Sequence, residues 1–207
     1  MPGKQELRSE ETRKAILQAA GDLFATRGFD AVTMREIAKA AGCSHTTIYI
    51  YYKDKEALLH QLSMPPLREL QERFERTLGA AGHPDGQLQE VSLSFIRFCL
   101  ANRNMHHLFF MTGSERVDAA SPRSELNALR NALFGLLQHA VGRSLGLAAE
   151  DPRLLAFSRI YFYMLHGIVG TYASSEEPPQ TLLERLTPTF EEAVDVMLCG
   201  FKERLNR

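Results

Sequence analysis

The stretch TMREIAKAAGCSHTTIYIYYKDK, residues 33–55, decides how the rest of the chain is interpreted. Thr33 and Glu36 have the spacing of a capping box, in which the threonine oxygen accepts a backbone N–H and the glutamate reaches back to the start of the helix. The residues that follow are apolar at helical spacing. Gly42 then supplies the positive φ that a tight turn needs. The pattern therefore predicts a short helix that ends in a tight turn.

A second short helix is predicted directly after this turn, from His45 to about Tyr51. Ser44 precedes it and has the side-chain oxygen that an N-cap needs. Two short helices joined by a glycine-containing turn form a helix-turn-helix, whose second helix can lie in the DNA major groove. Contacts to base edges and phosphates need hydrogen-bond donors, basic groups and aromatic reach, which are present in His45, Thr46, Thr47, Tyr49, Tyr51 and Lys55. Spacing alone leaves open an ordinary helical hairpin in an all-α core.

The full pattern closely resembles the DNA-binding domain of the TetR family of bacterial transcription regulators. The family pattern is A-x-x-A-G-x-S-x-x-T-ϕ-Y-x-Y-F/Y-x-S/D-K-E-x-L-L, where ϕ is apolar. It is matched by Ala38, Ala41, Gly42, Ser44, Thr47, Ile48, Tyr49, Tyr51, Tyr52, Asp54, Lys55, Glu56, Leu58 and Leu59. The upstream segment ATRGFDAVTMREIA, residues 25–38, is similar to the end of the family's first helix and its glycine turn. Beyond the motif, the chain resembles the family only in length and helical pattern.

The resemblance, together with the apolar periodicity along the chain, implies an all-α fold of about nine helices. Residues 1–54 would be the helix-turn-helix DNA-binding domain, and residues 55–207 the ligand-binding and dimerisation domain. Transferred by position, the groove-facing residues are Arg35, His45, Thr46, Thr47, Tyr49 and Tyr51, and the residues directed more to the DNA backbone are Thr33, Ser44 and Lys55. Ile50, Tyr52 and Lys53 depart from the residues that are usual in the family. His45 and Thr46 are not a common pair there, so the resemblance does not predict the base sequence that is read.

Apolar residues at helical spacing predict the remaining helices. A first helix is expected after an N-cap at Ser9, with residues 1–8 as a solvated arm. The helix that begins at Lys55 is expected to kink or split at Pro65 and Pro66. Proline lacks the backbone N–H and disfavours the α conformation in the residue before it.

The two long C-terminal helices are expected at residues 151–172 and 187–205, well after a loop at residues 79–86. Each has more apolar faces than the core of one subunit needs, and the resemblance implies that they pair with their copies as a four-helix bundle. We therefore predict a homodimer. The candidate interface residues are Tyr161, Leu165, Phe190, Val194, Met197 and Phe201.

Aromatic, histidine and methionine side chains are frequent in the C-terminal part and suit a cavity for a hydrophobic ligand. The candidate lining residues are Phe95, Phe98, His106, Phe109, Phe110, Phe134, Tyr161, Met164 and His166. The alternative is ordinary core packing, because such residues at helical spacing mostly pack against one another.

Net charge, cysteine spacing and the lengths of apolar runs exclude several classes of function. The 207-residue chain has a net charge of -1, so any DNA footprint must be a local patch supported by neutral donors. Its three cysteines, Cys43, Cys99 and Cys199, lack metal-ligand spacing and indicate reduced thiols. The charged N-terminus does not read as a signal peptide, and no run approaches the ~20 apolar residues of a membrane span. We expect a cytoplasmic protein that needs no membrane, metal or cofactor.

An enzyme is not expected, because the sequence has no G-x-S-x-G, no phosphate-binding glycine loop and no H-E-x-x-H. We expect instead a ligand-responsive regulator of transcription. It would be a repressor that binds a pseudo-palindromic operator in double-stranded DNA and is released by a small hydrophobic or aromatic effector. The alternative is a helical protein–protein interaction adaptor without specific DNA binding. The sequence specifies neither the effector nor the operator.

Overall fold

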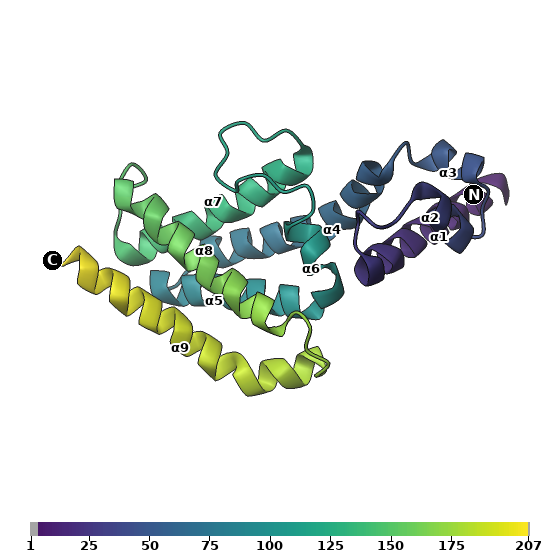
Figure 1. The fold of residues 1–207 in the computed structure, drawn as a ribbon. Helices are drawn as coiled ribbons and strands as arrows, with labels where there is room; N and C mark the ends of the chain where they lie inside the picture. Colours follow the sequence, from purple (N-terminus) through teal and green to yellow (C-terminus); the bar gives the residue numbers. More distant parts are fainter. Residues whose placement is uncertain (1–3, 207) are drawn as a thin grey trace. The chain divides into compact units, whose positions relative to one another are not determined.

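The computed structural model describes residues 4–206, with side chains from Glu6 onward. All regular secondary structure in this range is α-helical, as Figure 1 shows. The prediction of an all-α fold with about nine helices is confirmed. The helices are α1 Lys4–Arg27, α2 Met34–Ala40, α3 His45–Tyr51, α4 Lys55–Gly79, α5 Pro84–Ala101, α6 Arg103–Phe110, α7 Glu125–Leu145, α8 Pro152–Tyr172 and α9 Pro179–Leu205.

The chain forms two compact units. The first comprises the chain up to Leu67 together with Asn104–Ser114, and the second comprises Arg68–Arg103 and the chain from Glu115 onward. The boundary between the units therefore falls inside α4. The expected division after residue 54 separates DNA binding from ligand binding and dimerisation. Compactness does not test this division of functions, so it stays a prediction.

In the first unit, α1 packs against α2, and α2 packs against α3. Every helix contributes to one small apolar core, so the three helices support one another. The buried apolar side chains that form this core are Ile16, Ala20, Phe24, Val32, Ile37, Ala38 and Ile48.

Three helix starts differ from expectation. α1 begins at Lys4, so Ser9 lies inside it and the expected N-cap is wrong; residues 1–3 of the expected arm lie outside the described residues. Residues 4–8 are good helix formers, so nothing in them stops the helix earlier. α5 and α9 begin at Pro84 and Pro179, because proline suits the first helical turn. The expected loop at residues 79–86 is therefore shorter, since only residues 80–83 are non-helical.

Helix α4 runs without interruption through Pro65 and Pro66, so the expected split is wrong, whereas the expected kink stays a prediction. Proline disfavours a helix interior, but packing can override that preference when it anchors the flanking turns. Met64 and Leu67, on either side of the pair, are only 5% and 0% exposed. Their burial holds the helix together across the prolines.

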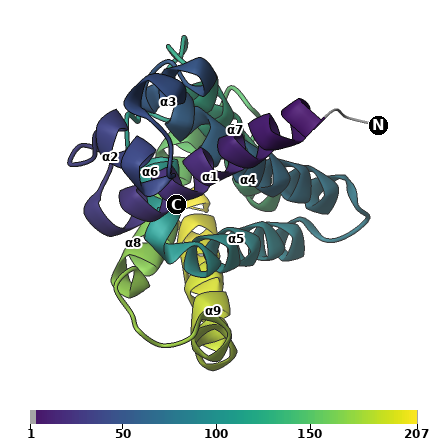
Figure 2. The same cartoon turned by 90° about the vertical axis from the view of Figure 1, so that its right-hand side faces the viewer.

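In the second unit, α5 packs against α7, α8 and α9, which places it at the centre of the bundle (Figures 1 and 2). It is buried on several sides. The Ser92 and Tyr161 hydroxyls lie 2.7 Å apart and join α5 to α8 in the interior. Arg103 donates to the backbone oxygens of Ser175 and Glu177, which fixes the loop before α9.

The predicted dimer contacts on α8 and α9 need correction. Five of the six side chains are covered by their own subunit, because α5 and α7 pack against α8 and α9. A partner subunit cannot reach them without unpacking this core. The five are Tyr161 (0% exposed), Leu165 (2%), Phe190 (2%), Val194 (0%) and Phe201 (5%), whereas Met197 is partly exposed.

Other apolar side chains on α8 and α9 are exposed. Ile160 and Tyr163 on α8 are 46% and 64% exposed, and Val196 on α9 is 59% exposed.

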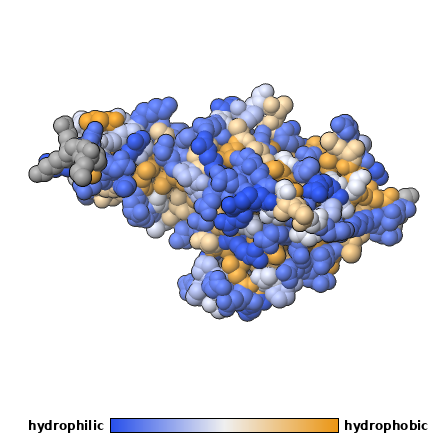
Figure 3. Space-filling view, turned by 180° about the vertical axis from the view of Figure 1, so that it is seen from behind, coloured by the Kyte–Doolittle hydropathy of each residue, from blue (hydrophilic) through white to orange (hydrophobic). Residues whose placement is uncertain are grey.

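The face of the molecule in Figure 3 is mostly hydrophilic, with apolar residues in small separate groups. None of the described helices is long and apolar enough to span a membrane.

Candidate nucleic-acid interface

The capping box that opens α2 is present. Thr33 Oγ1 accepts from the Glu36 backbone N–H at 3.3 Å, and Glu36 Oε2 accepts from the Thr33 backbone N–H at 2.9 Å. Arg27 contacts the other Glu36 oxygen at 2.9 Å. The bonds from Thr33, with a smaller contribution from Arg27, lower the pKa of Glu36 from its ordinary 4.5 to about 2. A lowered carboxyl pKa stabilises the fold above pH 4.5, and this contribution is lost as the pH falls towards 2.

The turn between α2 and α3 needs a glycine. Gly42 has a φ of 70°, which other residues rarely adopt, and Cys43 N–H closes the turn on Ala38 O at 3.0 Å. Ser44 then caps α3, since its Oγ accepts from the Thr47 N–H at 3.0 Å. The Thr47 hydroxyl is also 2.7 Å from Ser44 Oγ, so in the free protein Thr47 supports the cap.

Helix α3 presents most of the predicted base-reading groups on its surface. Ile48 is 0% exposed and fixes the helix to the core. His45, Thr46 and Tyr49 are exposed, and the His45 and Tyr49 rings pack edge to face with centroids 5.2 Å apart. Arg35 is exposed on α2. These donors and aromatic groups therefore face solvent, where a nucleic acid could meet them.

Lys55 is held by its own chain. Its Nζ donates to the Phe29 backbone oxygen at 2.8 Å and lies 4.6 Å from the centre of the Phe29 ring. In the free protein, therefore, Lys55 ties the start of α4 to the loop before α2. The predicted contact of Lys55 with the DNA backbone stays a prediction.

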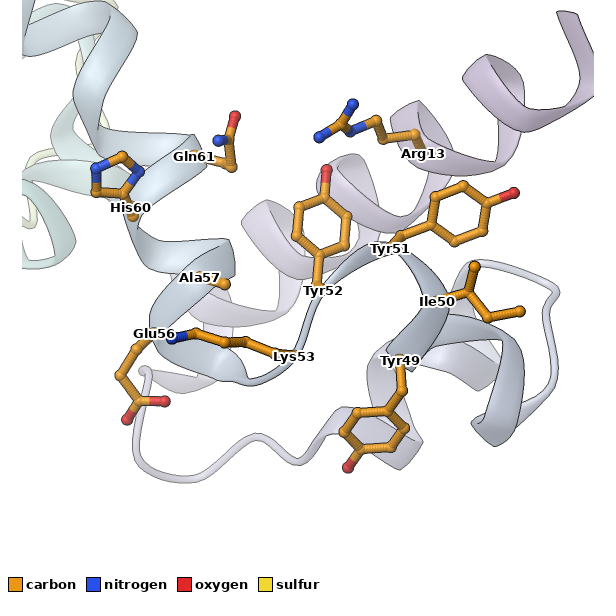
Figure 4. Close-up of a pocket in the computed structure, with 10 residues that line it drawn as sticks. All are labelled: Arg13, Tyr49, Ile50, Tyr51, Tyr52, Lys53, Glu56, Ala57, His60 and Gln61. Atoms are coloured by element: carbon orange, nitrogen blue, oxygen red, sulfur yellow. The ribbon is translucent and has the colours of Figure 1, made fainter. Parts of the chain in front are cut away.

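A groove of about 610 Å³ lies beside α3 (Figure 4). Its walls come from α1, the end of α3 and the start of α4. The sequence motif did not reveal it, because Arg13 and Gln61 lie outside the motif. The lining residues are Arg13, Tyr49, Ile50, Tyr51, Tyr52, Lys53, Glu56, Ala57, His60 and Gln61.

The helix-turn-helix and much of the remaining chain have counterparts in known proteins. Residues 16–62 match the family described as "Bacterial regulatory proteins, tetR family". The HTH-type transcriptional regulator YhgD of Bacillus subtilis is 33% identical over 161 residues, which cover 75% of this chain and 82% of YhgD. The chain belongs to the TetR family. The match to YdeS of Bacillus subtilis, 50% identical over 52 residues, covers 25% of this chain and only 26% of YdeS.

Solved structures of the TetR family share the fold. PfmR of Thermus thermophilus aligns with a TM-score of 0.65 at 22% identity, covering 88% of this chain and 96% of PfmR. FadR of Bacillus subtilis, solved in complex with stearoyl-CoA, aligns with a TM-score of 0.65 at 20% identity, covering 87% and 96%. The relatives are named as transcriptional regulators. The resemblance inferred from residues 33–55 is therefore confirmed.

Tyr52 follows the last residue of α3 and packs into the core of the first unit. The residue is 3% exposed, and its hydroxyl has no hydrogen-bond partner among the described residues. The Arg13 guanidinium lies 5.9 Å from the centre of its ring. A buried hydroxyl without a partner carries a desolvation cost that a phenylalanine would avoid.

Tyr52→Phe is therefore expected to stabilise the protein by about 1 kcal/mol, which raises Tm by roughly 2–4 °C. The matched control is Tyr161→Phe, which removes a hydroxyl that is paired with Ser92 at 2.7 Å and should destabilise. Thermal denaturation followed by circular dichroism measures both. A lower Tm for Tyr52→Phe would show that its hydroxyl has a stabilising partner.

The predicted ligand-lining residues fall in both compact units. His106, Phe109 and Phe110 lie on α6 in the first unit, and the other six belong to the second. In the second unit, the His166 ring lies 5.2 Å from that of Phe95 and 4.1 Å from that of Phe162. Phe162, which sequence analysis missed, also contacts Phe134, with ring centres 5.6 Å apart. That all nine residues line one cavity stays a prediction.

Tyr161 differs from the other members of this set. It is fully buried, and its hydroxyl is paired with Ser92. Burial raises the pKa of the Tyr161 hydroxyl above its ordinary value, so it stays neutral. These features are those of a satisfied core residue, and they favour core packing over ligand contact for Tyr161.

Proposed function

We propose that this TetR-family protein is a ligand-responsive repressor that binds a pseudo-palindromic operator as a homodimer. One observation carries the proposal: a capped helix-turn-helix presents the polar and aromatic face of α3 to solvent. A recognition helix of this kind enters the major groove, and two copies in a dimer read two half-sites. Because operator DNA in a bacterium lies in the cytoplasm, we place the protein there.

Each side chain of the interface receives a proposed role. We assign base contacts to His45, Thr46 and Tyr49, which are exposed on α3. Charged groups at the edges of the interface would meet phosphates, which position a protein on DNA without reading its sequence. The remaining contacts, to phosphates or to base edges beside them, are assigned to Arg13, Thr33, Arg35, Ser44, Thr47, Tyr51, Lys53 and Lys55.

The experiment that tests this function is selection of bound DNA from a random duplex library, followed by footprinting of the enriched sequence. We expect two inverted half-sites whose centres are one helical turn apart, about 34–36 Å, or a multiple of that distance. Enrichment of no common sequence would contradict specific recognition. Enrichment of a single half-site would contradict the symmetric dimer.

We propose that dimerisation uses the open apolar face of α8 and α9. The side chains of Ile160, Tyr163 and Val196 support this choice, since they are apolar and largely exposed. Gly167 and Gly200 have open space around the position of a Cβ, which would admit a close neighbour. This face replaces the buried residues that the sequence had indicated.

The proposed effector is a small hydrophobic or aromatic molecule. The Phe95, Phe134, Phe162 and His166 rings support this, because they gather in the interior of the second unit. The structure of the FadR relative contains stearoyl-CoA, a ligand with a long apolar chain. Similarity at 20% identity shows the fold alone, so stearoyl-CoA serves here as a first probe.

The proposed route from effector to DNA is helix α4, which begins directly after α3 and continues into the second unit. Pro65 and Pro66 have no N–H, so the carbonyls of Gln61 and Leu62 lose their helical donors. Two adjacent missing bonds make this turn the weakest part of α4 in backbone hydrogen bonding. We propose that α4 bends there when the effector binds.

Replacing Pro65 and Pro66 by alanine is therefore expected to weaken the coupling while keeping operator binding. In the wild type, saturating effector should lower operator affinity roughly 5- to 150-fold, and the double variant should show a smaller ratio. Operator titrations with and without stearoyl-CoA, or a compound identified by mass in the purified protein, measure it. If the variant binds the effector and releases DNA by the wild-type factor, the prolines are not the hinge.

A further inference from the structure

Ile50 is an unexpected residue on a surface that binds DNA. Its side chain is 78% exposed, more than any other large apolar side chain in the described part of the chain. Single exposed apolar residues are common on protein surfaces, so exposure alone carries no meaning. The position of Ile50 on α3 is what makes it informative.

Ile50 lies on the side of α3 opposite the core. Ile48 is fully buried, and two residues further along a helix correspond to about 200° of rotation. Thr46, four residues before Ile50, lies on the same outer side and is also exposed. In Figure 4, Ile50 points away from α4, whereas Tyr52 points into the groove. Ile50 therefore lies on the outer face of α3, beside Thr46 and next to the C-terminal end of the helix.

The chemistry of the major groove leaves one base-edge partner for such a side chain. Base edges there present hydrogen-bond donors and acceptors, and the thymine C5-methyl is their apolar group. Ile50 can neither donate nor accept a hydrogen bond. Its neighbour Thr46 has its hydroxyl 2.9 Å from Ser44 Oγ, so in the free protein that polar group is turned towards the cap.

We propose that Ile50 is a specificity-determining residue that contacts the methyl group of one thymine in each operator half-site. The inference rests on the proposed function, because it requires α3 to lie in the major groove. It goes further in naming the base and the chemical group that are read. A polar residue at this position would not discriminate thymine through its methyl group.

The test uses the sequence obtained by selection and replaces each thymine in turn by uracil, which removes only the methyl group. Operator affinity is measured for the wild type and for Ile50→Ala. One thymine position in each half-site should respond. Replacing that thymine by uracil in a single half-site removes the burial of one methyl group and should weaken wild-type binding about three- to five-fold. The same replacement should have no effect on Ile50→Ala, because the methyl group has lost its contact. The Ile50 side chain is exposed, so the variant should fold normally.

Met111→Ala is the control variant, because it removes another exposed apolar side chain of the same unit outside the helix-turn-helix. It should keep the wild-type response to uracil. If Ile50→Ala responds to every uracil as the wild type does, the proposal is overturned. If Ile50→Ala weakens binding but no uracil weakens the wild type, Ile50 packs elsewhere and the proposal is also overturned. If the wild type binds no sequence specifically, the proposed function itself fails.

Discussion

Val194→Glu is expected to unfold the second compact unit, whereas Val196→Glu is expected to leave it folded and to produce monomers. The two valines lie two positions apart on α9 and receive the same substitution. Val194 is 0% exposed and Val196 is 59% exposed. The difference in outcome therefore reports on burial and partner contact rather than on the chemistry of the replacement.

The cost at Val194 has two parts. Loss of a buried valine removes roughly 1.5–3 kcal/mol of apolar burial, and an unpaired carboxylate inside the core costs several kcal/mol more. The sum approaches the roughly 5–15 kcal/mol that stabilises a typical folded protein. We expect no cooperative thermal transition for this variant, or a Tm far below that of the wild type.

The substitution at Val196 should change little in an isolated subunit, since exposed sites usually respond within about 0.5 kcal/mol. At an apolar dimer interface, however, two copies of the glutamate would be buried without partners. Sedimentation should then show a folded monomer with weak operator binding. A Val196→Glu protein that remains dimeric and binds the operator would refute the proposed face, and a stable Val194→Glu protein would refute the burial of this position.

Tyr49→Ala is expected to have the second large effect, on DNA binding rather than on folding. A lost base contact costs roughly 1–3 kcal/mol, and a symmetric operator contains two copies of that contact. Tyr49 is 47% exposed, so its removal should leave the Tm nearly unchanged. Thr47→Ala is less informative, because Thr47 also bonds to Ser44 in the cap of α3.

Tyr49→Phe separates the two ways in which this residue can act. It removes the hydroxyl and keeps the ring that packs on His45. If the hydroxyl contacts a base, Tyr49→Phe should lose most of the affinity that Tyr49→Ala loses, and only for the operator. Competition titrations against operator and random DNA measure this. Wild-type operator affinity in Tyr49→Ala would remove Tyr49 from the interface.

The features that sequence analysis predicted well are those fixed within a few residues of one another. Both helix caps join residues that are three positions apart, Thr33 with Glu36 and Ser44 with Thr47. Gly42 forms the turn because it adopts a positive φ. These local rules locate the helix-turn-helix without knowledge of the packing.

Features that depend on distant packing were harder to predict. The apolar periodicity of α9 marks a buried stripe, but it cannot tell whether the subunit's own α5 or a partner covers that stripe. Val194, which the sequence predicts at the dimer interface, is instead 0% exposed within its own subunit. The proline pair in α4 shows the same limit, since burial of Met64 and Leu67 decides the outcome.

Only part of the candidate site could be predicted, because its remaining residues come together through packing between distant segments. Motif spacing identifies the α3 residues, but the groove in Figure 4 also needs Arg13 from α1 and Gln61 from α4. The motif predicts a DNA contact for Lys55, whereas the bond from Lys55 Nζ to Phe29 O depends on the folded chain. In the second unit, Phe162 joins the rings of Phe134 and His166, which lie on different helices.

The most direct test of the central claim compares the affinity of the wild-type protein for the selected operator with its affinity for a scrambled duplex of the same composition. Fluorescence anisotropy at physiological salt is suitable, because low salt strengthens non-specific binding to both duplexes. A TetR-family repressor that reads bases through α3 should bind the operator at least about 1,000-fold more tightly than the scrambled duplex. Equal affinity for the two duplexes would contradict sequence-specific recognition.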